Sequence, residues 1–517
     1  MTRRRWSSLA LFSLLLCASA AAAQTPPALT VVSAGPTGVI DSRNEANEVR
    51  LVFSEPMVTL GRIPAEVTVP FVRIAPAMPG SFRWSGTTIL VYTPDPKQPL
   101  PFATTYTVTV DASARAVSGR TLAKPFTFSF TTPPVRLLNV QWYRRGDTVN
   151  GPMVVLLRFN QRVRPEDVAA NLTATLAKHE WEAPSFTEAE RARYTAQDPA
   201  GLAAFEAKVA AVQKIADGGG AVALRLTRTW DKDRYPESPD LVVFETTTPV
   251  QPESHVRLTI GARMPSPAGR ATPGRTQAYT IEAEPAFFVD GFRCSEECSA
   301  DAYNPLRLRS SVPARAFAAA LTVTDITTAT PQPVRKPRRA TAAADRDDEG
   351  ASAYLTLEDA GYPAQAPNRK YVMTLPATFT AADGQTLGYP WLGIVDNWHA
   401  SAFTSFGDGH GVWEKDGGAQ LPFYARNVRD IVQWAFRVEP SQLMATIQQL
   451  SPAFRQSPAG NGTPRTLRVT PDRVQSHGLP LASALSPAGT GLVWAAVQDG
   501  RILDRTRRTD STNPVRA

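Results

Sequence analysis

A strand pattern that recurs along the chain constrains the fold more than any other feature. Apolar and polar residues alternate at 49–53, 155–159 and 306–310, and more loosely at 421–425. A period of two places the apolar side chains on one face of a strand and leaves the other face to solvent. Phe53 and Phe159 occupy equivalent places and lie 106 residues apart, close to the ~100 residues of one antiparallel sandwich. The sequence therefore predicts an all-β chain of tandem Ig-like β-sandwich domains.

A second set of predicted strands completes these units. The strands are expected at 106–110, 126–130, 256–260, 279–281 and 371–375. Gly119 and Gly384 lie between such strands, where a tight turn needs a positive φ. The 45 prolines, against 32 glycines, suit short strands joined by turns and oppose long helices.

The repeats divide the chain into four units. We expect β-sandwiches at 28–134, 135–285, 286–405 and 406–517, the last either complete or incomplete. Thr131-Thr132-Pro133-Pro134 ends the first unit, and its prolines predict a stiff joint.

The second unit carries a predicted helical insertion at about 185–216. A capping-box pattern at Ser185 to Glu188 and an Asp198-Pro199 start predict two helices. The second helix has one apolar stripe, made of Leu202, Phe205, Val209, Val212 and Ile215. We expect this hairpin to pack on its own sandwich; the alternative is a helix that binds a partner.

The N-terminus has the pattern of a signal peptide. Three arginines at 3–5 precede an apolar run at 9–20, and small residues lead to a cleavage site between Ala23 and Gln24. We therefore expect residues 1–23 to be removed from an exported protein of the periplasm or cell envelope. No other apolar run is long enough to cross a bilayer, so no transmembrane span is expected in the mature chain.

The charge of the chain is mild. Removal of the leader takes away three arginines and no acidic residue, which lowers the net charge from +8 to +5. A charge this small over so long a chain favours solubility and gives no reason to expect a nucleic-acid partner.

Cys294 and Cys298 are the two cysteines of the mature chain. In an exported protein an even pair favours a disulfide, here one that closes a tight loop into the third sandwich. The alternative is a metal-binding pair, but no second cysteine pair or histidine cluster follows at the required spacing. We expect no metal and no cofactor.

Other candidate sites have ordinary interpretations. No histidine belongs to a His-Glu-x-x-His motif, and His255 is interpreted as a solvent-facing strand residue. The stretch 407–411, which contains His410, lacks a P-loop ending and is interpreted as a turn between domains. The charged stretch 335–349 is interpreted as a solvated loop.

Three tryptophans lie near predicted strands and are interpreted as core residues, with a carbohydrate platform as the alternative: Trp84, Trp391 and Trp494. We therefore expect no enzyme.

Several longer motifs occur in order in the first and the last unit of the chain. The first unit contributes Phe53-Ser54-Glu55-Pro56-Met57, Leu90-Val91-Tyr92-Thr93-Pro94 and Phe128-Ser129-Phe130-Thr131-Thr132. The last unit contributes Gly411-Val412-Trp413-Glu414, Asp472-Arg473-Val474-Gln475-Ser476-His477-Gly478-Leu479 and Gly489-Thr490-Gly491-Leu492-Val493-Trp494. Taken together and in this order, these motifs resemble bacterial α2-macroglobulins. The resemblance implies an exported protein of many macroglobulin-type sandwiches that presents a bait segment to proteases and has endopeptidase-inhibitor activity.

The chain departs from that family at the thioester. The family's Cys-x-Glu-Gln motif is absent from the sequence, where Cys294-Ser295-Glu296-Glu297-Cys298 ends in cysteine. Family members are also much longer. We therefore expect an N-terminal portion, either truncated before the bait and thioester regions or a short degenerate member.

Two functions follow from the sequence. The first is the scaffold portion of an exported α2-macroglobulin-like protease trap without its own thioester. Through the full-length family architecture this implies proteases as partners, with peptidoglycan-synthesis proteins as a second class. The alternative is an Ig-like envelope or surface adhesion module with no inhibitor activity.

Overall fold

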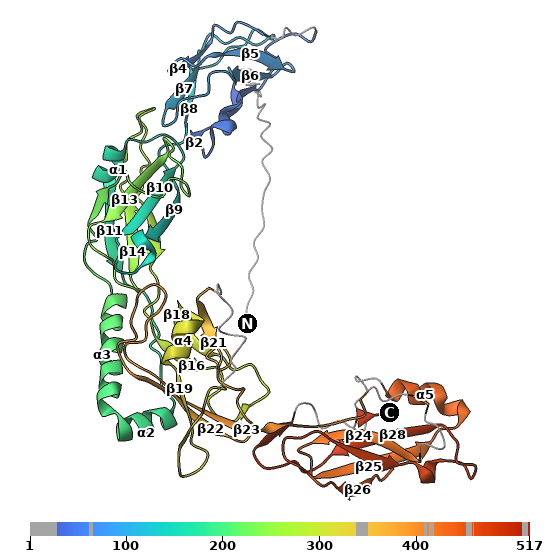
Figure 1. Cartoon of the computed structure of the whole chain (residues 1–517). Helices are drawn as coiled ribbons and strands as arrows, with labels where there is room; N and C mark the ends of the chain where they lie inside the picture. Colours follow the sequence, from blue (N-terminus) through green and yellow to red (C-terminus); the bar gives the residue numbers. More distant parts are fainter. Residues whose placement is uncertain are drawn as a thin grey trace, which may run out of the picture.

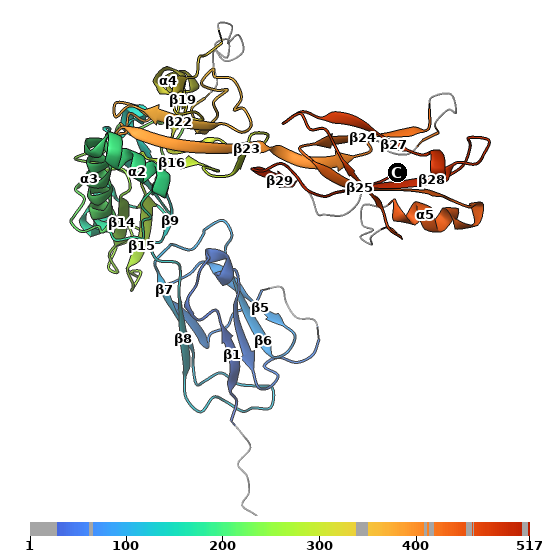
Figure 2. The same ribbon diagram turned by 90° about the horizontal axis from the view of Figure 1, so that it is seen from below.

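The computed structural model describes residues 28–61, 66–337, 350–407, 411–412, 418–450, 458, 460–508 and 515–517. Four β-sandwiches follow one another in chain order (Figures 1 and 2). The fold class expected from the sequence, tandem β-sandwiches with a small helical insertion, is confirmed.

The first sandwich packs two four-stranded sheets, β1-β3-β6-β5 and β2-β8-β7-β4, around one apolar core. Its strands are β1 Val31–Gly35, β2 Gly38–Val39, β3 Val49–Phe53, β4 Val72–Ala75, β5 Gly80–Ser85, β6 Ile89–Pro94, β7 Thr105–Val110 and β8 Phe126–Thr131. Gly119 has a φ of 84°, as its predicted turn requires.

The second sandwich has sheets β12-β13-β10-β9 and β11-β14-β15. Its elements are β9 Leu137–Arg144, β10 Met153–Phe159, α1 Pro165–Asn171, β11 Leu172–Ala177, β12 Leu224–Leu226, β13 Leu241–Thr246, β14 His255–Ile260 and β15 Gln277–Glu282. The core lies between these two sheets.

The third sandwich packs β16-β18-β21 against a sheet that begins β20-β19-β22-β23. Its elements are β16 Val289–Phe292, β17 Cys298–Ser299, β18 Leu306–Val312, α4 Ala314–Ala320, β19 Thr322–Asp325, β20 Gln332–Pro333, β21 Ser352–Leu355, β22 Lys370–Leu375 and β23 Trp391–Ser405.

Strand β23 does not stop at the edge of the third sandwich. Its first six residues pair with β22, and its last three pair with β24 of the fourth sandwich. In the fourth sandwich, one sheet consists of the end of β23 with β24 and β27, and the second sheet has the order β26-β25-β28-β30. Its further elements are β24 Gln420–Arg426, β25 Asp430–Arg437, α5 Leu443–Gln449, β26 Thr463–Thr466, β27 Gln475–Pro480, β28 Val493–Asp499, β29 Thr506–Arg508 and β30 Val515–Arg516. Figure 2 shows β23 as one long ribbon that enters both sandwiches.

The repeated sequence pattern marks the inner strands of the sheets. Strand β3 lies between β1 and β6, β10 between β13 and β9, β18 between β16 and β21, and β24 between β23 and β27. The predicted strands are therefore confirmed. The expected solvated face is wrong for β10, because Val154 and Leu156 are covered by a satellite cluster that includes Trp230 and Tyr235.

The helical insertion forms as a hairpin of α2 Glu188–Gln197 and α3 Pro199–Ala216. Asp198 caps α3 as the sequence predicts, accepting a hydrogen bond from the amide of Gly201 at 2.9 Å. The capping box of α2 is formed by Thr187 and Glu190, two residues beyond its expected place. Among the described residues, the sequence did not predict the short helices α1, α4 and α5, each of seven residues.

The hairpin packs on the third sandwich, so the prediction that it covers its own sandwich is wrong. Phe205 and Val212 are buried in the core of the third sandwich. The Phe205 ring centroid lies 5.1 Å from that of Tyr389 and 6.2 Å from that of Phe288. An apolar stripe shows that a helix is covered, but it carries no information about which surface covers it.

Polar contacts fix the hairpin to the third sandwich, at the start of β23 and in the segments that precede β16 and β23. The Lys208 ammonium donates to the carbonyls of Phe287 at 2.6 Å, Leu387 at 2.7 Å and Thr386 at 3.1 Å. Burial lowers the pKa of Lys208 to about 8.

Helix α2 contributes two further contacts. The Glu190 carboxylate accepts a hydrogen bond from the amide of Ile394 at 2.8 Å, and the Tyr194 hydroxyl donates one to the carbonyl of Pro390. A segment of the second unit thereby satisfies main-chain groups of the third.

Replacing Phe205 by alanine should destabilise the third sandwich and leave the second nearly unchanged. Removal of a buried phenylalanine costs about 3–5 kcal/mol of unfolding free energy. Hydrogen–deuterium exchange should therefore accelerate in β22 and β23. Lys214→Ala, on the exposed side of the same helix, is the control and should stay within about 0.5 kcal/mol. Faster exchange confined to β11 and β14 would contradict this packing.

Candidate functional site at the joint between the third and fourth sandwiches

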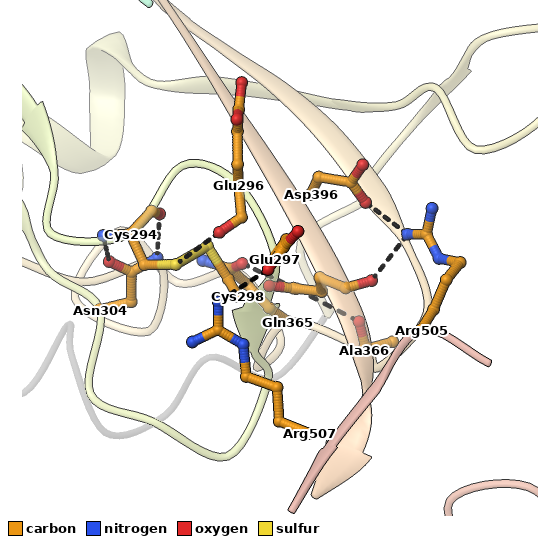
Figure 3. The surroundings of a disulfide bond; sticks show 11 residues. Cys294, Glu296, Glu297, Cys298, Asn304, Gln365, Ala366, Asp396, Arg505 and Arg507 are labelled. Carbon is orange, nitrogen blue, oxygen red and sulfur yellow. Dashed lines mark hydrogen bonds and ion pairs between the residues drawn. A yellow bond between two sulfur atoms is a disulfide. The ribbon is translucent and has the colours of Figure 1, made fainter. Parts of the chain in front are cut away.

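Cys294 and Cys298 form a disulfide in the structure. Cys298 is 1% exposed and begins β17, which pairs in parallel with Asn397 and Trp398 of β23. The side-chain amide of Asn304 donates a hydrogen bond to the carbonyl of Cys294, and the side-chain oxygen of Asn304 accepts one from the main-chain N–H of Cys294, both at 2.8 Å (Figure 3). The loop closed by the disulfide is thus held against the middle of β23.

The same loop contacts a segment two hundred residues further along the chain. Strand β29 pairs in parallel with β23. Arg507 from β29 lies 3.1 Å from the Glu297 carboxylate, and Arg505 pairs with Asp396 of β23 (Figure 3). Arg505 also donates to the carbonyl of Asn397 at 3.3 Å. The disulfide therefore lies at the joint between the third and fourth sandwiches as well as at the entrance to the third.

A network around Asp472 holds the other side of this joint. The Asp472 carboxylate accepts the amide of Ala400 at 2.8 Å and the side-chain amide of Asn427 at 3.0 Å, and it lies 2.8 Å from Nδ1 of His399. The Asp472 amide in turn donates to the side-chain oxygen of Asn427 at 2.8 Å. One carboxylate thus links β23, the end of β24 and the loop before β27.

The environment of Asp472 favours its charged form. Burial by itself raises the pKa of this carboxyl, but the hydrogen bonds from His399, Asn427 and the Ala400 amide outweigh burial. The net result is a pKa below the ordinary value. The sequence gives no sign of this role, because Asn427 and Asp472 are 45 residues apart and no local pattern brings them together.

The remaining histidines lie apart from this network. His179 and His255 stack on each other with ring centroids 3.6 Å apart. The prediction of a solvent-facing His255 is therefore wrong: the residue is half-buried, and burial together with the His179 ring lowers its pKa. His477 stacks on Phe423. His410 lies outside the described residues.

The predicted core tryptophans are found in or against apolar cores. Trp391 and Trp494 are 2% and 5% exposed, and Trp84 is half-buried against the core of the first sandwich. The carbohydrate platform has no support from this placement. Ala23 and Gln24, like most of the charged stretch 335–349, lie outside the described residues.

The joint has the chemistry of a structural connection. Within the described ranges, the His399 ring hydrogen-bonds to Asp472 and to no other side chain. No group of three or more histidine, cysteine, aspartate or glutamate residues there is placed to hold a metal ion.

None of the described helices has the length and apolarity of a membrane span.

The first unit of the chain is similar to a known domain family. Residues 23–132 match the family model of the bacterial Ig-like domain. No curated protein sequence matches the chain.

Solved structures show only weak similarity over the whole chain. Native α2-macroglobulin from Escherichia coli spanning domains MG0-NIE-MG1 is 10% identical, with 74% of this chain and 96% of that chain covered at a TM-score of 0.18. A Salmonella α2-macroglobulin mutant is 11% identical, with 95% and 34% covered at 0.16. The S-layer protein SbsC is 10% identical, with 95% and 54% covered at 0.15. TM-scores this low do not establish a common domain arrangement.

Replacing Asp472 by asparagine should weaken the fourth sandwich at neutral pH. Loss of hydrogen bonds to a charged group costs about 1.5–3 kcal/mol of unfolding free energy. Because the folded-state pKa lies below the ordinary 3.8, this contribution is present above that value and is lost as the pH falls through the folded-state pKa. In urea unfolding, the free energy of unfolding of the variant should be lower than that of the wild type at pH 7, and this difference should become smaller in acid.

The matched control for this variant is Asp504→Asn, which alters an exposed carboxylate in the same sandwich. Its effect should stay within about 0.5 kcal/mol at either pH. An Asp472→Asn gap that stays constant down to pH 2 would exclude the charged carboxylate as the source of the stabilisation.

Proposed function

We propose that this chain is the scaffold portion of an exported α2-macroglobulin-like protease trap and has no catalytic activity of its own. The observation that carries the proposal is the coupling of successive sandwiches. Strand β23 belongs to both the third and the fourth sandwich, and the hairpin of the second unit is built into the third. Shared elements of this kind transmit a fixed geometry along the chain, as the body of a trap requires.

The sequence motifs supply the family expectation for this proposal. They resemble bacterial α2-macroglobulins in both the first and the last unit. The endopeptidase-inhibitor activity, the bait segment and the thioester belong to the full-length architecture. In this proposal proteases and peptidoglycan-synthesis proteins are partners of that larger assembly, in the periplasm or cell envelope.

A second candidate function is an Ig-like module for surface interaction. It is favoured by the match of residues 23–132 to the bacterial Ig-like domain. Cosedimentation of the purified chain with isolated peptidoglycan sacculi or whole cells separates the two functions. Saturable retention would support the interaction module, whereas the scaffold should remain in the supernatant.

As a scaffold alone, the chain should not protect a protease from large substrates. After incubation with an excess of the chain, trypsin should cleave both a protein substrate and a small peptide substrate at full rate. No protease conjugate that survives boiling in detergent should form, because the sequence has no Cys-x-Glu-Gln motif. Nicking is expected within the charged stretch 335–349.

A small active-site inhibitor of trypsin is the control, since it blocks cleavage of both substrates. Loss of activity on the protein substrate alone would mean that the chain encloses trypsin. That result would overturn the assignment of the chain as scaffold only.

A further inference from the structure

Two histidine rings stack on each other at the joint between the second and third sandwiches. His179 follows β11 in the segment that leads to the hairpin, and His255 is the first residue of β14. Their ring centroids lie 3.6 Å apart, and the ring planes are inclined by 13°. The His179 side chain is 9% exposed. The pair thus holds the segment that leaves the second sandwich against a strand of that sandwich.

Glu253 connects the histidine pair to the entry of the third sandwich. Its Oε1 atom lies 3.8 Å from Nε2 of His179. Its Oε2 atom accepts a hydrogen bond from the amide of Ala286 at 2.9 Å, and its own amide donates one to the carbonyl of Glu284 at 2.7 Å. Ala286 belongs to the core of the third sandwich. A change at the pair therefore reaches a hydrogen bond that holds the two sandwiches together.

The segment that carries His179 reaches the third sandwich as well. Two residues further on, Trp181 packs against that core, with its ring centroid 5.9 Å from that of Phe288. The main-chain amide of His179 donates to the carbonyl of Ala216 at the end of α3, at 3.0 Å. The histidine pair is therefore connected to the third sandwich by two routes, Glu253 and the segment that carries Trp181.

The closed joint offers no hydrogen bond to a protonated ring of His179. Both ring nitrogens of His179 are buried, and neither has a hydrogen-bond partner among the described residues. An imidazolium has two N–H donors and a charge to satisfy. The Glu253 oxygen at 3.8 Å is beyond hydrogen-bonding distance. A buried cation without such partners loses its hydration, and a second cation stacked on it adds repulsion. The arrangement in the structure therefore favours two neutral rings.

Further charged side chains lie on the elements packed around the pair: Lys178, Glu180, Asp217, Arg257, Glu282 and the ion pair of Arg144 with Glu284. Apart from that ion pair, these side chains are exposed to solvent, which screens their effect. Burial and the His179 ring lower the pKa of His255, and the carboxylates of Glu282 and Glu253 offset only part of this effect. The charged surroundings thus do not reverse the preference for the neutral pair.

We propose that the stacked pair His179–His255, together with Glu253, is an acid-sensitive switch that opens the joint between the second and third sandwiches. A proton from solvent binds a ring nitrogen more readily in the open form, where water hydrates the imidazolium. Acid therefore shifts the equilibrium towards the open form. Opening breaks the hydrogen bond between Glu253 and Ala286, while each sandwich keeps its own core.

The direction of the response follows from proton linkage. Because the pKa of His255 in the closed joint is below its ordinary value of 6.5, the closed form binds protons less readily than the open form. The stability of the closed joint is therefore complete above that value and decreases as the pH falls below it. At neutral pH the joint stays closed, as in the structure.

The test is hydrogen exchange at the Ala286 amide in the purified full chain at pH 7.5 and pH 5, corrected for the intrinsic pH dependence of exchange. The opening constant should rise in acid, by up to about thirtyfold for each histidine that binds a proton only in the open form. The amides of Leu156 in β10 and Met373 in β22 report on the two cores, and their opening constants should stay within about twofold.

Matched variants assign the response to the pair. The double variant His179→Phe/His255→Phe keeps two stacked rings without a titratable nitrogen, so the opening constant at Ala286 should differ by less than about twofold between the two pH values. His477→Phe is the control, because His477 also stacks on a phenylalanine and burial also lowers its pKa. This control should keep the acid response at Ala286. The double variant His179→Gln/His255→Gln replaces the first if that one does not fold.

Several results would overturn the proposal. An opening constant at Ala286 that is equal at both pH values would exclude a switch. A smaller opening constant in acid would mean that a protonated His179 pairs with Glu253 and tightens the joint. Equal increases at Leu156 and Met373 would identify unfolding of whole sandwiches. An acid response that persists in the double variant would assign it to other groups.

Discussion

The arrangement of the last two sandwiches depends on a single strand that changes its partners along its length. Strand β23 pairs with β22, then with the short parallel strands β17 and β29, and finally with β24. Each partner satisfies main-chain groups that would otherwise be left without hydrogen bonds where the two domains meet. The disulfide loop, the Arg505–Asp396 pair and the Asp472 network all gather around the middle of this strand. These contacts make the joint a part of both sheets.

The hairpin extends the same principle to the second sandwich. Helix α3 leaves the second unit and places Phe205 and Lys208 on the third, where the ammonium contacts three carbonyls. Gly201 permits this approach, because a Cβ at that position would lie 2.6 Å from Cγ of Pro390. The second, third and fourth sandwiches are therefore linked by elements that each belong to two of them.

The sequence predicts the strands well and the joints poorly. Alternation locates β3, β18 and β24, because each has one face on a core and the periodicity records that burial directly. The caps at Asp198 and the turn at Gly384, with a φ of 86°, follow from local backbone chemistry. The contacts of Phe205, the partner exchange of β23 and the Asp472 network involve residues distant in sequence. No local pattern encodes such pairings.

We infer that the second to fourth sandwiches keep a fixed geometry, because β23 and the hairpin each belong to two of them. Spin labels on cysteines introduced at the exposed positions Arg257 of β14 and Thr463 of β26 would measure it directly by pulsed electron paramagnetic resonance. The shared strand and the hairpin predict one narrow distance distribution. A broad or multimodal distribution in the otherwise intact protein would contradict the coupling and the scaffold function that rests on it.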